Sequence, residues 1–89
     1  MAIITVEIVN RRGLHARASA KFVKLAETFD AIVTVEKDGS SVSGSSIMGL
    51  MMLAAARGDS VRIETTGPDS DAALSGLQAL IEAGFHEED

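Results

Sequence analysis

Apolar and polar residues alternate over two stretches of the chain, which is the pattern of a β-strand with one buried face. The stretches are residues 4–8 and residues 61–65. A third stretch, residues 31–37, is rich in β-branched side chains and leads into Asp38-Gly39, a dipeptide that favours a tight hairpin turn. Residues 40–43 then provide a short return strand. The pattern therefore predicts four strands.

Between these strands the apolar spacing changes to that of amphipathic helices. A first helix begins near Ala16, and a last helix begins after residues 67–71 and ends near Gly84. The apolar run 47–53 has no clear period, but Ser46 before it is a good N-cap, and its Met and Leu content favours a short helix. The expected buried stripes are Ala18, Phe22, Leu25 and Phe29 in the first helix, and Ala73, Leu74, Leu77 and Ile81 in the last.

The predicted order of elements is β-α-β-β-α-β-α, which places the chain in the α+β class. Alternating strands imply a sheet with one face in water, so the helices should cover the other face. At 89 residues the chain is expected to be a single domain, residues 1–89, with residues 85–89 forming a flexible acidic tail.

The composition narrows the possible chemistry. Aromatic residues make up only 3% of the chain, so the core must be aliphatic. Cysteine is absent, which excludes disulfides and thiolate metal sites, and two distant histidines make a poor metal site. We expect no cofactor and no metal. No apolar run approaches the ~18 residues of a membrane span, and no secretion signal precedes the first strand, so we expect a cytoplasmic protein that does not bind membranes.

The net charge of −5 argues against general nucleic-acid binding, but the charge is unevenly distributed. Residues 8–26 contain no Asp or Glu and hold five of the eight basic residues, and residues 39–58 are also free of acids. The basic cluster is either a solvated helix face or a site that receives an anion. Its members are Arg11, Arg12, Arg17, Lys21 and Lys24.

The segment GLHARAS, residues 13–19, places a histidine at the start of the first predicted helix. His15 lies at or next to the N-cap, where unpaired N–H groups and the helix dipole favour an anion. We expect the N–H groups of Ala16, Arg17 and Ala18 to face such an anion, and the Arg17 side chain to bind it. Neutral imidazole is a nucleophile near pH 7, and the helix end and basic neighbours should keep the ring neutral. The alternative is that His15 only begins the helix.

These residues resemble the active-site segment of the histidine-containing phosphocarrier protein (HPr) family of the bacterial phosphoenolpyruvate-dependent phosphotransferase system. The resemblance extends over essentially the whole chain and implies an open-faced sandwich, with a four-stranded, mostly antiparallel sheet and three helices on one face. Its further landmarks are Phe22-Val23, the Asp38-Gly39 hairpin, the Ser46 segment, residues 58–61 and residues 67–71.

The resemblance also implies a function. His15 would accept a phosphoryl group on Nδ1 from phosphorylated enzyme I and pass it to an acceptor of the enzyme IIA type, with Arg17 supporting the group. The chain would be a phosphocarrier and not an enzyme, because phosphoenolpyruvate and any metal belong to enzyme I. Competing interpretations are a small non-catalytic domain that senses an anion, and a regulatory paralogue that has lost transfer.

One position departs from the family pattern. The family usually has proline where this chain has Ala18, a good helix former that leaves an additional N–H in the first turn. The form His-Ala-Arg-Ala-Ser is similar to carriers of the nitrogen-related branch of the phosphotransferase system, or to those of bacteria without a full sugar-transport branch. The sequence therefore leaves open the sugar-transport branch and a regulatory nitrogen branch.

Ser46 is a second candidate site. As an N-cap it stabilises the short helix, and the resemblance implies phosphorylation by an HPr kinase/phosphorylase that would inhibit transfer from enzyme I. The helix after it is too apolar to be fully buried, so we expect Met48 and Met51 to form an exposed patch beside His15. Together with Lys21 and Lys24 this patch would dock acidic partners, and the carrier is expected to be a monomer.

Overall fold

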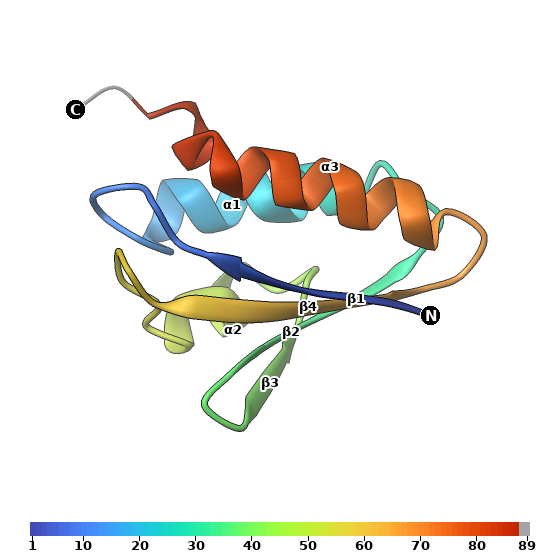
Figure 1. Cartoon of the computed structure of the whole chain (residues 1–89), viewed down its shortest axis with the longest axis horizontal. Coiled ribbons are helices and arrows are strands. Elements are labelled where there is room, and N and C mark those ends of the chain that lie inside the picture. Colours follow the sequence, from blue (N-terminus) through green and yellow to red (C-terminus); the bar gives the residue numbers. More distant parts are fainter. Residues whose placement is uncertain (88–89) are drawn as a thin grey trace.

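Four strands form one sheet, and three α-helices and a short 3₁₀ turn, η1, complete the chain in the predicted order (Figure 1). The structure, a computed structural model, describes residues 1–87. The elements are β1 Ala2–Glu7, α1 Ala16–Ala26, β2 Ile32–Lys37, β3 Ser40–Ser43, α2 Ile47–Met52, β4 Ser60–Thr66, α3 Ser70–Glu82 and η1 Gly84–His86. The fold class predicted from the sequence is confirmed.

The strands lie in the order β1-β4-β2-β3, and every neighbouring pair is antiparallel. Val6 lies opposite Val61 and Ile4 opposite Ile63, so the apolar positions of β1 and β4 share one face of the sheet. Helices α1 and α3 run side by side over the sheet (Figure 1), while α2 contacts α1 and β3. The sheet is thus wholly antiparallel, where the sequence indicated only a mostly antiparallel one.

The core is aliphatic, as the composition required, with Phe22 and Phe85 as its fully buried aromatic residues. Both predicted helical stripes point into it, with Leu25 and Leu74 only partly buried against the core. Phe29, which the sequence assigned to the first stripe, follows the end of α1 and is also only partly buried. Each stripe is wider than predicted, because a helix that packs on the sheet and on a second helix buries two adjacent rows. The additional buried residues are Ser19, Val23 and Ala26 in α1 and Leu80 in α3.

Three connections meet at one end of the molecule, on the left in Figure 1: the β1–α1 loop, the α2–β4 loop and η1. The N–H of Leu14 donates to the carbonyl of Ala55 at 2.9 Å, which joins the first two. Gly13 has a φ of 64°, and a Cβ there would lie 2.2 Å from the same carbonyl oxygen. Only glycine therefore allows this close approach, which holds the residue before His15 in place.

Of the residues that the sequence assigned to a flexible acidic tail, Phe85 and His86 belong to η1. Phe85 is fully buried, and its carbonyl accepts a hydrogen bond from Lys21 Nζ at 2.6 Å. The aromatic ring returns to the core, and Glu87 is directed back toward the β1–α1 loop. Residues 88–89 of the expected tail lie outside the described residues. Over the part of the chain that the structure describes, no helix has the length and apolarity needed to cross a bilayer.

Candidate functional site

His15 is the N-cap of α1, which confirms its predicted position. Its backbone is extended, and its ring Nδ1 accepts a hydrogen bond from the N–H of Arg17 at 3.3 Å. The His15 carbonyl accepts from the N–H of Ser19 at 2.9 Å, so the turn is closed on both sides. The imidazole thus performs the capping role that Ser, Thr, Asp or Asn usually performs.

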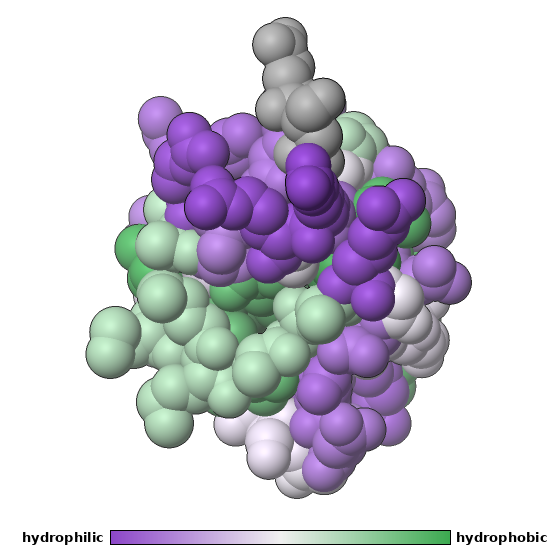
Figure 2. Space-filling view, turned by 90° about the vertical axis from the view of Figure 1, so that its left-hand side faces the viewer, coloured by the Kyte–Doolittle hydropathy of each residue, from purple (hydrophilic) through white to green (hydrophobic). Residues whose placement is uncertain are grey.

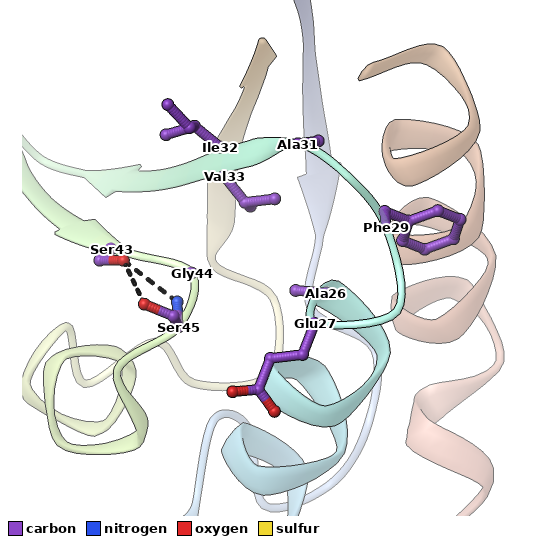
Figure 3. A pocket seen from close by; sticks show the side chains of 9 residues that line it. All are labelled: Ala26, Glu27, Phe29, Ala31, Ile32, Val33, Ser43, Gly44 and Ser45. Atoms are coloured by element: carbon purple, nitrogen blue, oxygen red, sulfur yellow. Dashed lines mark hydrogen bonds between the residues drawn. The ribbon is translucent and has the colours of Figure 1, made fainter. Parts of the chain in front are cut away.

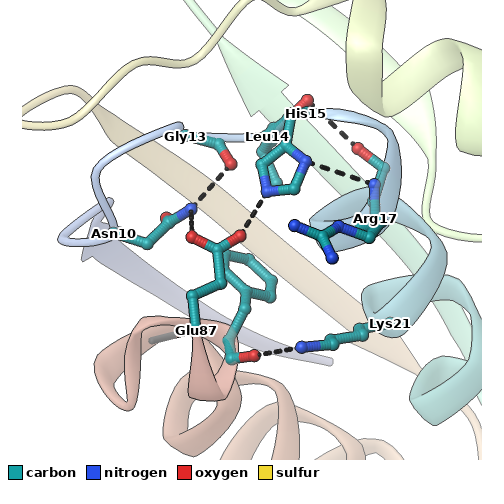
Figure 4. Close-up of polar contacts among 9 residues, drawn as sticks. Asn10, Gly13, Leu14, His15, Arg17, Lys21 and Glu87 are labelled. Carbon is teal, nitrogen blue, oxygen red and sulfur yellow. Dashed lines mark hydrogen bonds and ion pairs between the residues drawn. The ribbon is translucent and has the colours of Figure 1, made fainter. Parts of the chain in front are cut away.

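The other ring nitrogen of His15 contacts a carboxylate from the far end of the chain. Glu87 Oε1 pairs with His15 Nε2, and Glu87 Oε2 accepts a hydrogen bond from Asn10 Nδ2 at 3.1 Å (Figure 4). The same Asn10 amide donates to the Gly13 carbonyl at 2.8 Å. Asn10 is 5% exposed and the Glu87 side chain 11% exposed. The ring is therefore held between the helix start and a partly buried carboxylate.

These contacts define the tautomer of the neutral ring. Nδ1 accepts from a backbone N–H and therefore carries no proton, while Nε2 faces a carboxylate and donates its proton to it. The lone pair of Nδ1 is directed toward the start of α1. Nδ1 is thus the unprotonated nitrogen of the neutral ring.

Glu87 changes the electrostatics expected from the sequence. Burial raises the pKa of its carboxyl, but hydrogen bonds from His15 and Asn10 and the charges of His15 and Lys21 outweigh this, so the pKa lies below its ordinary value of 4.5. Residues 8–26 contain no Asp or Glu themselves, but the fold brings the carboxylate of Glu87 into contact with His15 in this stretch. Sequence reasoning considered only basic neighbours of His15, and it missed a partner 72 residues away.

The basic residues of the cluster are all exposed, as a docking or anion-binding role requires. The Arg17 guanidinium extends toward the space beside the His15 ring (Figure 4), and within residues 1–87 it has no ion-pair partner. Ala16 is exposed, whereas Ala18 is fully buried. The N–H of Ala18 is therefore covered, whereas Ala16 and Arg17 at the start of the helix are open to solvent.

Ser46 is the N-cap of α2, as predicted. Its Oγ accepts a hydrogen bond from the N–H of Gly49 at 2.9 Å, and its carbonyl accepts from Leu50 at 3.0 Å. The side chain is partly buried, whereas Ser45 is exposed and bonded to Ser43. The structural role of Ser46 therefore exists independently of any modification.

Helix α2 presents an apolar surface next to the His15 loop. We call Ile47, Met48, Met51 and Met52 the methionine patch; they are 41%, 70%, 39% and 79% exposed. The predicted exposure of Met48 and Met51 is confirmed, and Met52 and Ile47 were missed. Figure 2 looks onto this end of the molecule and shows an apolar area directly below a dense group of hydrophilic residues.

A hollow elsewhere on the surface lacks the chemistry of an anion site. It lies between the end of α1 and the strands β2 and β3, and its only charged lining residue is Glu27 (Figure 3). It contains neither His15 nor Arg17. Over the described part of the chain, no three His, Asp or Glu side chains are grouped to hold a metal ion.

Comparisons with known proteins identify chains that are similar to this one over most of its length. The family described as "PTS HPr component phosphorylation site" matches residues 3–83. Phosphocarrier protein HPr of Neisseria meningitidis is 51% identical over 83 residues, 93% of each chain. Phosphocarrier protein NPr of Escherichia coli is 40% identical over 85 residues, 94% of each chain. The crystal structure of HPr-C-His from Thermoanaerobacter tengcongensis has a TM-score of 0.95 at 43% identity and covers 100% of both chains.

Proposed function

Because the chain belongs to the HPr family of phosphocarrier proteins of the phosphotransferase system, we propose that His15 is the residue that carries the phosphoryl group. The observation that supports this most directly is the orientation of His15 Nδ1. Its lone pair faces the N–H groups at the start of an 11-residue helix, beside an exposed arginine. A nucleophile and the donors for its phosphoryl oxygens are thus in one place.

The transfer would proceed by in-line displacement. The Nδ1 lone pair attacks the phosphorus of a phosphohistidine on enzyme I, the donor P–N bond breaks, and its electron pair stays with the donor nitrogen. The N–H of Arg17, now bonded to Nδ1, would turn to a phosphoryl oxygen, and the N–H of Ala16 and the Arg17 guanidinium would bind others. A histidine on an enzyme IIA-type acceptor then removes the group by the same step.

The test uses radiolabelled phosphoenolpyruvate and purified enzyme I. We expect one acid-labile label per wild-type chain, no label on His15→Ala, and a rate on Arg17→Ala at least about tenfold below wild type. His86→Ala is the matched control, since His86 is exposed on η1 and its ring forms none of the hydrogen bonds described at His15. A wild-type chain without label contradicts the carrier role and favours an anion-sensing domain, and label on His15→Ala contradicts the site.

The acceptor separates the two branches of the system. Offering the labelled carrier to sugar-type and nitrogen-type enzyme IIA domains at equal concentration compares the two rates directly. The Ala18 form of the active-site segment leads us to expect faster transfer to the nitrogen-type domain. Faster transfer to the sugar-type domain contradicts that assignment and leaves the carrier role intact.

We further propose that phosphorylation of Ser46 lowers the rate of acceptance from enzyme I. A phosphate at the start of α2 is compatible with the fold, because it adds negative charge where N–H groups point outward. It would also place that charge beside the methionine patch, which an acidic partner must approach. Ser46→Asp should therefore lower the phosphorylation rate and keep the helix cap, whereas Ser45→Asp at the neighbouring exposed position is the control.

The Ser46 proposal is separated from simple loss of the cap by a third variant. Ser46→Ala removes the side-chain acceptor for Gly49 N–H and should cost about 1 kcal/mol of stability, measured by urea unfolding. Its phosphorylation rate should remain at the wild-type level. Equal rates for Ser46→Asp and Ser46→Ala would contradict regulation by charge.

A further inference from the structure

We propose that Glu87 is a positioning residue for phosphoryl transfer: it holds His15 in the tautomer with a free Nδ1 and stabilises the positive charge that the ring gains. This inference rests on the proposed function of His15. It is carried by the contacts of one carboxylate, whose two oxygens bind His15 Nε2 and Asn10 Nδ2.

Glu87 is held in place from several sides, unlike an ordinary surface ion pair. Asn10, which donates to it, is 5% exposed and is itself fixed by its hydrogen bond to the Gly13 carbonyl. Two residues earlier, the fully buried Phe85 anchors the backbone, and Lys21 Nζ binds its carbonyl at 2.6 Å. A carboxylate whose position is already fixed loses little conformational entropy when it binds the ring. Little of its favourable interaction with His15 is therefore offset by ordering of the side chain.

The Asn10–Glu87–His15 chain has the general form of a carboxylate that orients a histidine. A carboxylate on one ring nitrogen selects the tautomer in which the opposite nitrogen is the nucleophile. In this protein the opposite nitrogen is Nδ1, which faces the start of α1. Without Glu87, the N–H of Arg17 would still favour an unprotonated Nδ1, but only through one backbone contact of 3.3 Å.

The charge balance of the transfer step gives Glu87 its second role. When the Nδ1 lone pair bonds to phosphorus, Nε2 keeps its proton and the ring acquires one positive charge. The donor phosphohistidine, protonated on its other nitrogen, loses the phosphoryl group and becomes neutral. No proton has to move in this step. Glu87 then faces a cationic ring, and its interaction with the ring strengthens as the bond to phosphorus forms.

The other charged groups near the ring do not replace Glu87. Arg17 and Lys21 project from α1 and are both positive, so they favour the phosphoryl oxygens and oppose a cationic ring. Asn10 is uncharged and contacts the carboxylate instead of the imidazole. Among residues 1–87, Glu87 is the only acidic side chain paired with His15.

Three variants of the full chain test the proposal. Glu87→Gln keeps an acceptor oxygen but removes the charge, and Glu87→Ala removes both. Glu82→Gln is the matched control, because Glu82 is exposed on α3 and accepts its hydrogen bond from Gln78 instead of from the site. The first measurement is the ¹⁵N chemical shifts of the His15 ring in the unphosphorylated protein at a pH where the ring is neutral. The second is the initial rate of label transfer from phosphorylated enzyme I.

In wild type and Glu82→Gln we expect the Nε2–H tautomer and equal rates. In Glu87→Gln the tautomer should persist and the rate should fall by about tenfold, the effect of one charge-assisted hydrogen bond. In Glu87→Ala the ring should show mixed tautomers, and the phosphorylation rate should fall by at least as much as in Glu87→Gln. If Glu87 had only a structural role, its substitution would leave the ¹⁵N shifts of the His15 ring unchanged. The Gln and Ala variants would then show the same tautomer.

The proposal is overturned if Glu87→Ala has wild-type ring shifts, or if its rate lies within twofold of the Glu82→Gln control. Thermal unfolding of each variant confirms that the compared chains are folded. A different result would show that the proposed carrier function itself is wrong. In that case wild-type chain takes up no label, while the ring shifts still report whether Glu87 sets the tautomer.

Discussion

At the scale of single residues, the ionisation of Glu87 connects the site to stability. Because the pKa of Glu87 is depressed in the folded state, its carboxylate contributes stability above its ordinary value of 4.5, and that contribution is lost as the pH falls through the folded value. Wild type should therefore unfold at a higher temperature than Glu87→Gln at pH 7, and the difference should be smaller at an acidic pH below the depressed pKa of the carboxyl. A difference that is the same at both pH values would contradict the assignment.

Ala18 gives a second prediction at this scale. Its N–H lies in the first turn of α1, where no helical carbonyl is available, so a proline removes no hydrogen bond. Ala18→Pro should change the free energy of unfolding by less than about 1 kcal/mol in urea denaturation. Ala20→Pro, inside the hydrogen-bonded part of the helix, should cost about 3 kcal/mol. Similar losses for the two variants would show that the first turn does not tolerate the ring.

At the scale of elements, the loop before α1 depends on Gly13. Gly13 and Gly39 both have positive φ values, but a Cβ at Gly13 would lie 2.2 Å from the Ala55 carbonyl, whereas nothing lies within 4 Å at Gly39. Gly39→Ala should cost only the backbone strain, about 1–2 kcal/mol. Gly13→Ala should cost clearly more, because the loop must also move away from the α2–β4 connection.

The Gly13 variant has a functional consequence that the Gly39 variant lacks. Displacing the loop moves the Gly13 carbonyl and Asn10 away from each other, and with them the support of Glu87. Gly13→Ala should therefore lose phosphorylation rate at a temperature where both variants are fully folded, as monitored by circular dichroism. A wild-type rate in folded Gly13→Ala would show that the loop tolerates the shift.

The short helix α2 shows why some parts of an element could be predicted and others could not. Ser46 was identifiable as a cap because the residue type and the apolar run behind it coincide. The exposure of Met52 was not, because six residues are fewer than two helical turns and do not define an apolar face. The tertiary contacts with α1 and β3 decide that Leu50 is buried and Met52 is not.

At the scale of the whole molecule, charge and apolar surface combine at one end. Met48→Ser, which removes the apolar side chain without adding a charge, should raise the KM for phosphorylation by enzyme I by about fivefold or more, with little change in stability, because Met48 is 70% exposed. Ile32→Ser is the control, since Ile32 is 72% exposed and begins β2 beside Ala26, at the opposite end of α1 from His15. Equal KM values for the two variants would exclude the methionine patch from docking.

The fold could be predicted because its strands and helices carry their own periodicity. The strand order could not, since alternation shows which face is buried but not which strand is the neighbour. The same distinction applies to the site. His15 and Arg17 are adjacent in sequence and mark a helix start, whereas the pairing of His15 with Glu87 joins residues 72 positions apart and depends on the burial of Phe85.

The placement of Glu87 beside His15 also determines how the protein should be handled in the laboratory. Strand β1 begins at the opposite end of the molecule from the start of α1, where His15 is the N-cap (Figure 1). An affinity tag or fluorescent domain fused before Met1 would therefore lie away from His15, whereas one attached soon after Glu87 would be held close to the ring that we propose carries the phosphoryl group. Immobilisation through the N-terminus is thus the geometry in which binding and transfer rates report on the unmodified carrier.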